Sequence, residues 1–172
     1  MEFSRFELYD LINRQGPLWL VGADLREVNL SGANLKRATL YGSNLSGSDL
    51  RWAVLEDATL NAANLNEVDL REAFLRGVKL IGASLRGANL RRADLSSANL
   101  HEADLERANL EYTDLTGVNL VDANLRGANL GWANMGALAY TSEPDFHGAK
   151  YSKDTIWPEG FDPEQVGAIL VA

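Results

Sequence analysis

The sequence contains no cysteine and only two histidines among its 172 residues. Without cysteine, the chain has no disulfide, no thiolate nucleophile and no thiolate metal ligand. It also lacks any run of about 18 apolar residues, the length that a membrane-spanning helix needs. The N-terminal segment MEFSRFELYDLINRQG contains acidic residues and no uninterrupted apolar core, unlike a signal peptide. We therefore expect a cytoplasmic protein with no membrane segment.

Catalytic signatures are equally scarce. His101 directly follows a regularly spaced leucine, so it is expected to face solvent, and His147 lies far from it along the chain. A phosphate-binding loop requires a glycine-rich segment between a strand and a helix, whereas the glycines here follow a five-residue spacing. The sequence therefore predicts a protein that is not an enzyme and that has no cofactor and no metal site.

What the chain does contain is a leucine at every fifth residue from Leu20 to Leu130, a series that Met135 continues. Five residues advance a helix by about 140°, and in a continuous strand an odd spacing sends successive leucines to opposite faces, so neither element buries the set. A short extended trio followed by a two-residue turn does bury it, because the leucine and the residue two before it then share one face. The spacing thus predicts a coil of short extended sides joined by tight corners.

The other positions of the five-residue unit agree with this geometry. Two residues before each leucine, from Ala23 to Ala133, stands Ala sixteen times, Val four times and otherwise Ser or Thr, but never a charge. Asn or Asp usually precedes the leucine, and nine of the fifteen glycines stand two residues after it, where the corner is sharpest. The predicted core is therefore narrow, with small residues between the leucines.

The unit Ala-(Asp/Asn)-Leu-X-X resembles the pentapeptide-repeat family over roughly residues 18–137. This resemblance implies an all-β fold, a right-handed quadrilateral β-helix (a β-solenoid) in which four units make one coil. With about 4.8 Å per coil, about six coils would give a rod roughly 28 Å long. The tail segment WPEGFDPEQVGA also resembles the C-terminal ends of many cyanobacterial members.

The two ends are expected to cap the β-helix, because a stacked rod leaves unpaired backbone and leucines at each end. Residues 1–17 are predicted to form an N-terminal helical cap and residues 18–137 the β-helix. Residues 138–172 are predicted to form an irregular C-terminal cap, with Trp157 and Phe161 packed on the last coil. The chain is then a single structural domain, either a monomer or a dimer through a terminal cap.

Charge bears on an activity that the resemblance implies, since some pentapeptide-repeat proteins imitate duplex DNA and modulate DNA gyrase. The whole chain has a net charge of −8, but residues 20–136 carry 15 acidic and 12 basic side chains, a net charge of only −3. A mimic of the phosphate backbone should be acidic along its sides. Instead, Arg51, Arg71 and Arg91 follow one another at intervals of 20 residues. This basic column either holds an anionic partner or covers neighbouring coils with its aliphatic stems.

The same 20-residue period stacks Asp94 on Asp114, and it places Trp52 in one column with Tyr112 and Trp132. The stacked carboxylates either bind a divalent cation through oxygen or occupy the solvated polar slot of the repeat, and we favour the second interpretation. The aromatic column is expected to meet the C-terminal tail.

The outward position directly before the leucine, called the slot, usually holds Asn or Asp. Several neighbouring slots hold other residues instead. Val54 and Phe74 stack in one column and Thr59 and Lys79 in the next, and the corner after that carries Tyr41 and Ile81. A clustered apolar area on a polar rod is a candidate contact site. The alternatives are ordinary strand propensity and cover by a terminal segment. The candidate binding residues on these two adjacent sides are Tyr41, Val54, Phe74, Lys79 and Ile81.

These features together predict a rigid, non-enzymatic scaffold that binds an unidentified protein partner, with no direct nucleic-acid binding and no membrane contact. Two alternatives remain open: a DNA-mimicking modulator of DNA gyrase, and a structural solenoid that assembles end to end. The fold itself does not choose between them, since function depends on the surface that the fold presents.

Overall fold

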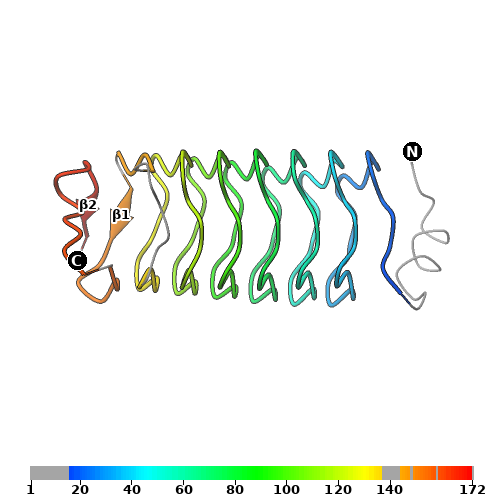
Figure 1. Ribbon diagram of the computed structural model, residues 1–172, viewed down its shortest axis with the longest axis horizontal. Helices are drawn as coiled ribbons and strands as arrows, with labels where there is room; N and C mark the ends of the chain where they lie inside the picture. Colours follow the sequence, from blue (N-terminus) through cyan, green and yellow to red (C-terminus); the bar gives the residue numbers. More distant parts are fainter. Residues whose placement is uncertain (1–15, 137–143, 148, 158, 172) are drawn as a thin grey trace.

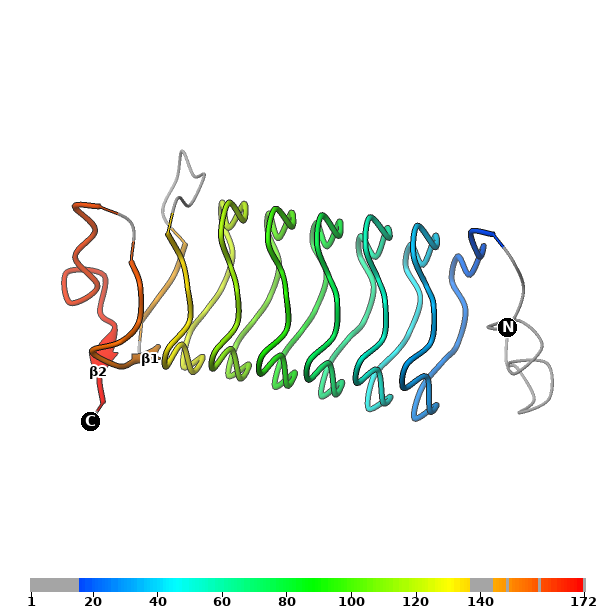
Figure 2. The same ribbon diagram turned by 90° about the horizontal axis from the view of Figure 1, so that it is seen from below.

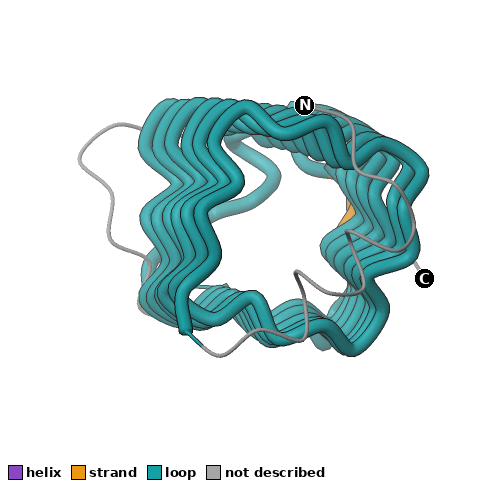
Figure 3. Tube along the Cα trace, turned by 90° about the vertical axis from the view of Figure 1, so that its right-hand side faces the viewer, coloured by secondary structure: helices purple, strands orange, loops and turns teal. Residues whose placement is uncertain are grey.

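The computed structural model describes residues 16–136, 144–147, 149–157 and 159–171. They form a rod of stacked coils that advance along the long axis of the molecule (Figures 1 and 2). Seen along that axis, successive coils lie over one another in a four-sided outline (Figure 3). The helical cap predicted over residues 1–17 falls almost entirely outside the described residues. Within the described ranges, no helix is long and apolar enough to cross a membrane.

Each side of a coil is joined to the next coil by one isolated parallel bridge, 20 residues apart in the repeats. At Asn44, for example, the backbone N–H donates to Ala23 O at 2.9 Å and the C=O accepts from Leu25 N at 2.7 Å. The extended sides are thus the predicted trios, but a corner on either side stops each bridge from growing into a longer strand. The bridges form four columns, which we number side 1 to side 4 and which begin at Trp19–Thr39, Asp24–Asn44, Asn29–Asp49 and Asn34–Val54.

The corners share one turn, in which the N–H of the inward residue donates to the C=O of the preceding leucine, as from Ala38 to Leu35 at 3.0 Å. The second corner residue is left-handed, with a φ of 62° at Gly42 and 58° at Trp52. Glycine adopts this conformation freely, whereas other L-residues are disfavoured there by about 1–2 kcal/mol. This difference accounts for the glycines that recur at this position.

The Asn or Asp before each leucine closes the corner from outside. The Oδ1 atom of Asn34 accepts from the N–H of Lys36 at 3.2 Å, and Asp94 Oδ1 accepts from the N–H of Ser96 at 2.9 Å. This is the side-chain turn that Asn and Asp favour, since their short side chains reach the backbone two residues on. It provides the physical reason for Asn and Asp in the slot.

The core is the narrow column of leucine and alanine that the sequence predicts, and Leu95 and Ala98 are buried at 0% and 1% exposure. Two serines replace the small apolar residue at inward positions. The hydroxyls of Ser43 and Ser48 donate to the carbonyls of Leu40 at 2.7 Å and Leu45 at 2.6 Å. Since a buried hydroxyl is costly only when unpaired, these bonds let serine stand in a dry core.

The C-terminal tail continues the stack although its sequence no longer shows the repeat. Asp145 bridges to Asn124 on side 2, and two short parallel strands, β1 (Lys150–Tyr151) and β2 (Ile169–Leu170), follow on side 3. Phe146 is fully buried. Trp157 and Phe161 are stacked with ring centroids 4.9 Å apart, and both pack against the hydrophobic core as predicted. The last described part of the chain therefore covers the leucines of the final repeats.

Candidate protein-binding surfaces

The first candidate surface contains the five residues singled out in the sequence. Val54 and Phe74 are bridge partners on side 4, and the Phe74 side chain is 48% exposed. Lys79 is exposed on side 1, where it bridges to Thr59. Tyr41 is 53% exposed at the corner between sides 1 and 2. Ile81, two coils further along the same corner, is partly buried.

The structure places these residues in two apolar groups rather than one. Val54 and Phe74 lie on side 4, whereas Tyr41 and Ile81 lie beyond the whole width of side 1. The corner between sides 4 and 1 is charged, since Lys36 Nζ pairs there with Glu56 and Arg37 Nε lies 3.9 Å from Asp57 Oδ2. A partner that covers all five predicted residues would thus cross a strip of polar and charged side chains.

A recess that sequence reasoning missed lies at this charged corner and has a volume of about 410 Å³. Gly77 forms part of its wall, and a Cβ atom added there would come within 2.8 Å of the Asp57 carboxylate. A glycine in a corner position is a signal too common in this sequence to reveal a recess by itself. The recess is lined by Lys36, Glu56, Asp57, Arg76, Gly77 and Ser97.

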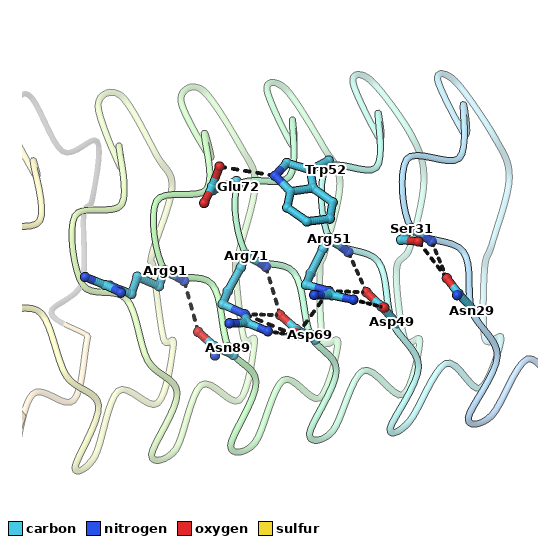
Figure 4. Close-up of polar contacts among 10 residues, drawn as sticks. All are labelled: Asn29, Ser31, Asp49, Arg51, Trp52, Asp69, Arg71, Glu72, Asn89 and Arg91. Atoms are coloured by element: carbon cyan, nitrogen blue, oxygen red, sulfur yellow. Dashed lines mark hydrogen bonds and ion pairs between the residues drawn. The ribbon is translucent and has the colours of Figure 1, made fainter.

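The second candidate surface is the arginine column at the corner between sides 3 and 4 (Figure 4). The guanidinium of Arg51 donates to both carboxylate oxygens of Asp49, at 2.9 and 2.6 Å, and Arg71 makes the same paired contact with Asp69. Arg91 follows Asn89 instead of an Asp, and its Nε lies 3.6 Å from a carboxylate oxygen of Glu111. The first two arginines are therefore neutralised within their own sides, which argues against an anion-binding ladder.

These contacts shift the carboxylate pKa values downward. The side-chain hydrogen bond from Arg26 lowers the pKa of Asp24 to about 2, and that from Arg51 lowers the pKa of Asp49. Burial raises the pKa of Asp69, but the hydrogen bonds and charge of Arg71 outweigh it and leave a net decrease. The repeat thus holds ionised carboxylates beside arginines two residues later.

We expect acid to destabilise the wild-type rod more than an Arg51→Gln/Arg71→Gln variant. A carboxylate whose pKa is lowered by folding stabilises the folded state above its unfolded pKa, and this contribution is lost as the pH falls through the folded pKa. For Asp49 and Asp69, whose pKa values Arg51 and Arg71 lower from 3.8, the contribution is lost as the pH falls below this value. Melting temperatures measured by circular dichroism at pH 7, 4, 3 and 2 check this. Equal losses in wild type and variant would show that the arginine pairs do not set the acid response.

Aromatic side chains extend the same corner toward the C-terminus. The rings of Tyr112 and Trp132 are stacked at 5.0 Å and 7°, and the guanidinium of Arg92 lies 5.7 Å from the Tyr112 ring centre. The backbone N–H of Trp132 donates to Ser152 Oγ at 3.1 Å. The tail therefore contacts the C-terminal end of the aromatic column through the Trp132 backbone, while the two rings stack on each other.

In the described ranges, no three of His, Cys, Asp and Glu gather in a way that would hold a metal ion. Asp94 and Asp114 bridge to each other as the sequence predicts. Each accepts hydrogen bonds from the residue two positions later, Ser96 or Thr116. Both carboxylates thus have the structural role of the polar slot.

Comparison with known proteins identifies the repeat. The Pentapeptide repeats family matches in eight copies over residues 20–57, 53–91, 75–111 and 103–136. The chain belongs to the pentapeptide repeat family. Members of this family fold as right-handed quadrilateral β-helices, which is the architecture of the four columns of bridges. No curated protein matches the chain.

Several solved pentapeptide repeat structures are similar to this one. The protein Rfr23 of the cyanobacterium Cyanothece 51142 is 31% identical over 81% of this chain and 88% of that chain, with a TM-score of 0.41. HetL of Nostoc sp. strain PCC 7120, a protein involved in heterocyst differentiation regulation, is 29% identical over 87% and 82%, with a TM-score of 0.36. QnrB1, a plasmid-mediated fluoroquinolone resistance protein, is 18% identical over 90% and 92%, with a TM-score of 0.42.

Proposed function

We propose that this pentapeptide repeat protein is a non-enzymatic, rigid scaffold that binds another protein through sides 4 and 1. The observation that carries the proposal is Phe74, an aromatic ring 48% exposed in a slot that Asn34 and Asp94 fill in the same column. Phe74 stands beside Val54, so the two form an apolar area in a column whose other slots in the repeats hold Asn or Asp. Removing such an area from water stabilises a complex by about 25 cal/mol for each Å² buried.

The bridges make this surface suitable for recognition. Each outward slot is fixed to the coil before it, as where the N–H of Phe74 donates to Ala53 O at 2.9 Å and its C=O accepts from Leu55 N at 2.7 Å. A preorganised surface loses little conformational entropy when a partner docks, and this favours binding. The cytoplasmic location and the absence of catalysis stay predictions.

A Val54→Asn/Phe74→Asn variant tests the proposal. Asn already occupies this column at Asn34 and Asn134, so the variant should keep the fold and the net charge while removing the apolar area. We expect the amount of a specific partner captured from native lysate to fall at least about tenfold, equivalent to about 1.4 kcal/mol. Circular dichroism before capture checks that the variant is folded.

The matched control is Ile156→Asn, which removes an apolar residue from the same column near the other end of the rod, where it is 55% exposed. It should capture the partner as wild type does. Equal capture by all three proteins would rule out Val54 and Phe74 as the contact and leave them as ordinary strand residues.

DNA mimicry is the alternative that the charge distribution opposes. Acidic side chains along the rod repeatedly form ion pairs with basic side chains. Arg86, for example, contacts Asp104 at 2.9 Å and Glu106 at 2.7 Å. A surface neutralised in this way does not present the continuous negative charge of a phosphate backbone. A supercoiling assay with purified gyrase distinguishes the two. If a stoichiometric amount of this protein protected gyrase or inhibited its supercoiling activity, DNA mimicry would be favoured over the scaffold.

End-to-end assembly is the second alternative, and the C-terminal end provides an observation for it. Strand β2 is hydrogen bonded to β1, and its Ile169 and Leu170 are 52% and 54% exposed. Exposed apolar strands at a sheet edge invite pairing with another chain. Light scattering over a range of protein concentrations distinguishes a monomer or a dimer through this cap from a growing filament.

A further inference from the structure

Resting on the proposed function, we propose that the recess at the corner between sides 4 and 1 is a carboxylate subsite. The partner segment is then an acidic peptide: an apolar side chain lies on Val54 and Phe74, and an Asp or Glu beside it pairs with Arg76 and Lys79. The proposal names the chemistry of the partner, which the apolar area alone does not.

The geometry places the two kinds of contact next to each other on one coil. Phe74 occupies the slot of side 4, Arg76 follows it at the corner and lines the recess, and Lys79 occupies the slot of side 1. The backbone of this stretch is fixed, since Phe74 is bridged to Val54 and Lys79 to Thr59. An extended segment lying across the corner therefore meets the apolar area first and the cations next.

Charge balance distinguishes Arg76 and Lys79 from most basic side chains of the rod, and Arg92, which also has no ion pair, lies against the Tyr112 ring instead. At the same corner, Lys36 is paired with Glu56, and Arg37 lies near Asp57. Arg76 and Lys79, by contrast, make no side-chain hydrogen bond or ion pair with any residue that the structure describes. Two unpaired cations beside an exposed phenyl ring favour, at this corner, a ligand that carries separate carboxylates.

The same corner disfavours a continuous polyanion. Glu56 and Asp57 line the recess together with Lys36 and Arg76, so a nucleic acid with one phosphate at every step would bring negative charge against these carboxylates. A peptide can set one acidic side chain toward Arg76 and a neutral one toward Asp57. The observations therefore favour an acidic peptide over a nucleic acid.

A random dodecapeptide library displayed on phage, selected on the full chain, tests the inference. We expect enriched peptides to combine Asp or Glu with a neighbouring aromatic or aliphatic residue. Synthetic copies should bind an Arg76→Glu/Lys79→Glu variant at least about tenfold more weakly. An Arg107→Glu/Lys153→Glu variant, which changes the net charge equally at other places, should bind within about twofold of wild type. Circular dichroism confirms that each variant is folded.

The remaining outcomes contradict the inference in distinguishable ways. Neutral or basic peptides that need Val54 and Phe74 but not Arg76 and Lys79 would refute the carboxylate subsite and leave the proposed scaffold standing. Peptides that depend on neither pair, or no enrichment above a blank support, would count against both. Equal affinity for a 20-base-pair DNA duplex would show a general polyanion site and overturn the peptide assignment.

Discussion

Ala98→Phe is expected to lower the free energy of unfolding by about 1–3 kcal/mol, because it overpacks the narrow core. Ala98 is 1% exposed. In the coils before and after it, the same inward position is held by Val78 and Val118, both fully buried, and bridges at Asn99 and Asn119 fix the coil spacing. A phenyl ring at this position can be accommodated only by pushing neighbouring coils or leucines apart. Urea unfolding followed by circular dichroism measures the loss.

The matched control introduces the same ring at a position that faces outward instead of into the core. Thr59→Phe places phenylalanine in an outward slot, as Phe74 already is, on the side 1 column that also contains Asn99. We expect this variant to stay within about 0.5 kcal/mol of wild type, as surface substitutions usually do. If Ala98→Phe and Thr59→Phe had the same stability, the assignment of inward and outward positions would be wrong.

The fold was predictable because one physical constraint recurs in every unit. Each side must bury a leucine and the residue two before it, so a five-residue period excludes helix and continuous strand and leaves the cornered coil. That argument correctly placed Leu95 and Ala98 in the core. It gave no reason for the Asn or Asp beside the leucine, which the structure explains by hydrogen bonds such as Asn34 Oδ1 to the Lys36 N–H.

The repeat pattern did not predict three other features: the non-glycine corners, the stacking of the tail and the recess. Trp52 and Tyr112 adopt left-handed conformations at corners where glycine would be expected, with φ values of 58° each, because the turn is imposed by the coils around them. The tail keeps its bridges at spacings other than 20 residues, as from Asn134 to Ile156, so its part in the stack does not show in the sequence period. The recess depends on the side chain of Asp57 over Gly77, a contact between different coils.

Deleting residues 61–65, one complete side, is expected to leave a folded rod that has lost the proposed binding surface. The corners are alike: Ala58 N–H donates to Leu55 O at 3.0 Å and Ala63 N–H to Leu60 O at 3.1 Å. Joining Leu60 to Asn66 therefore recreates a normal unit, and every later leucine still points inward. The coils after the deletion simply turn by one side relative to those before it.

The outer surface does not survive this rotation, because it depends on the 20-residue period rather than the five-residue one. Val54 would now lie opposite Lys79, and Phe74 opposite Asp49, so the apolar area is split while the core is kept. We expect circular dichroism to show a cooperative β-rich fold, and capture of the partner to fall as far as in the Val54→Asn/Phe74→Asn variant.

Two further deletions separate these effects. Removing residues 96–115, a whole coil, keeps Val54 opposite Phe74, so binding should persist in a shorter rod. Removing residues 61–64 puts every later leucine out of phase with the upstream corners, and this variant should lose its cooperative transition. If the five-residue deletion instead unfolds as the four-residue one does, the four sides are not interchangeable, and the columns of outward residues contribute to the fold itself. If it folds and still captures the partner, the stacking of Val54 on Phe74 is not what the partner recognises.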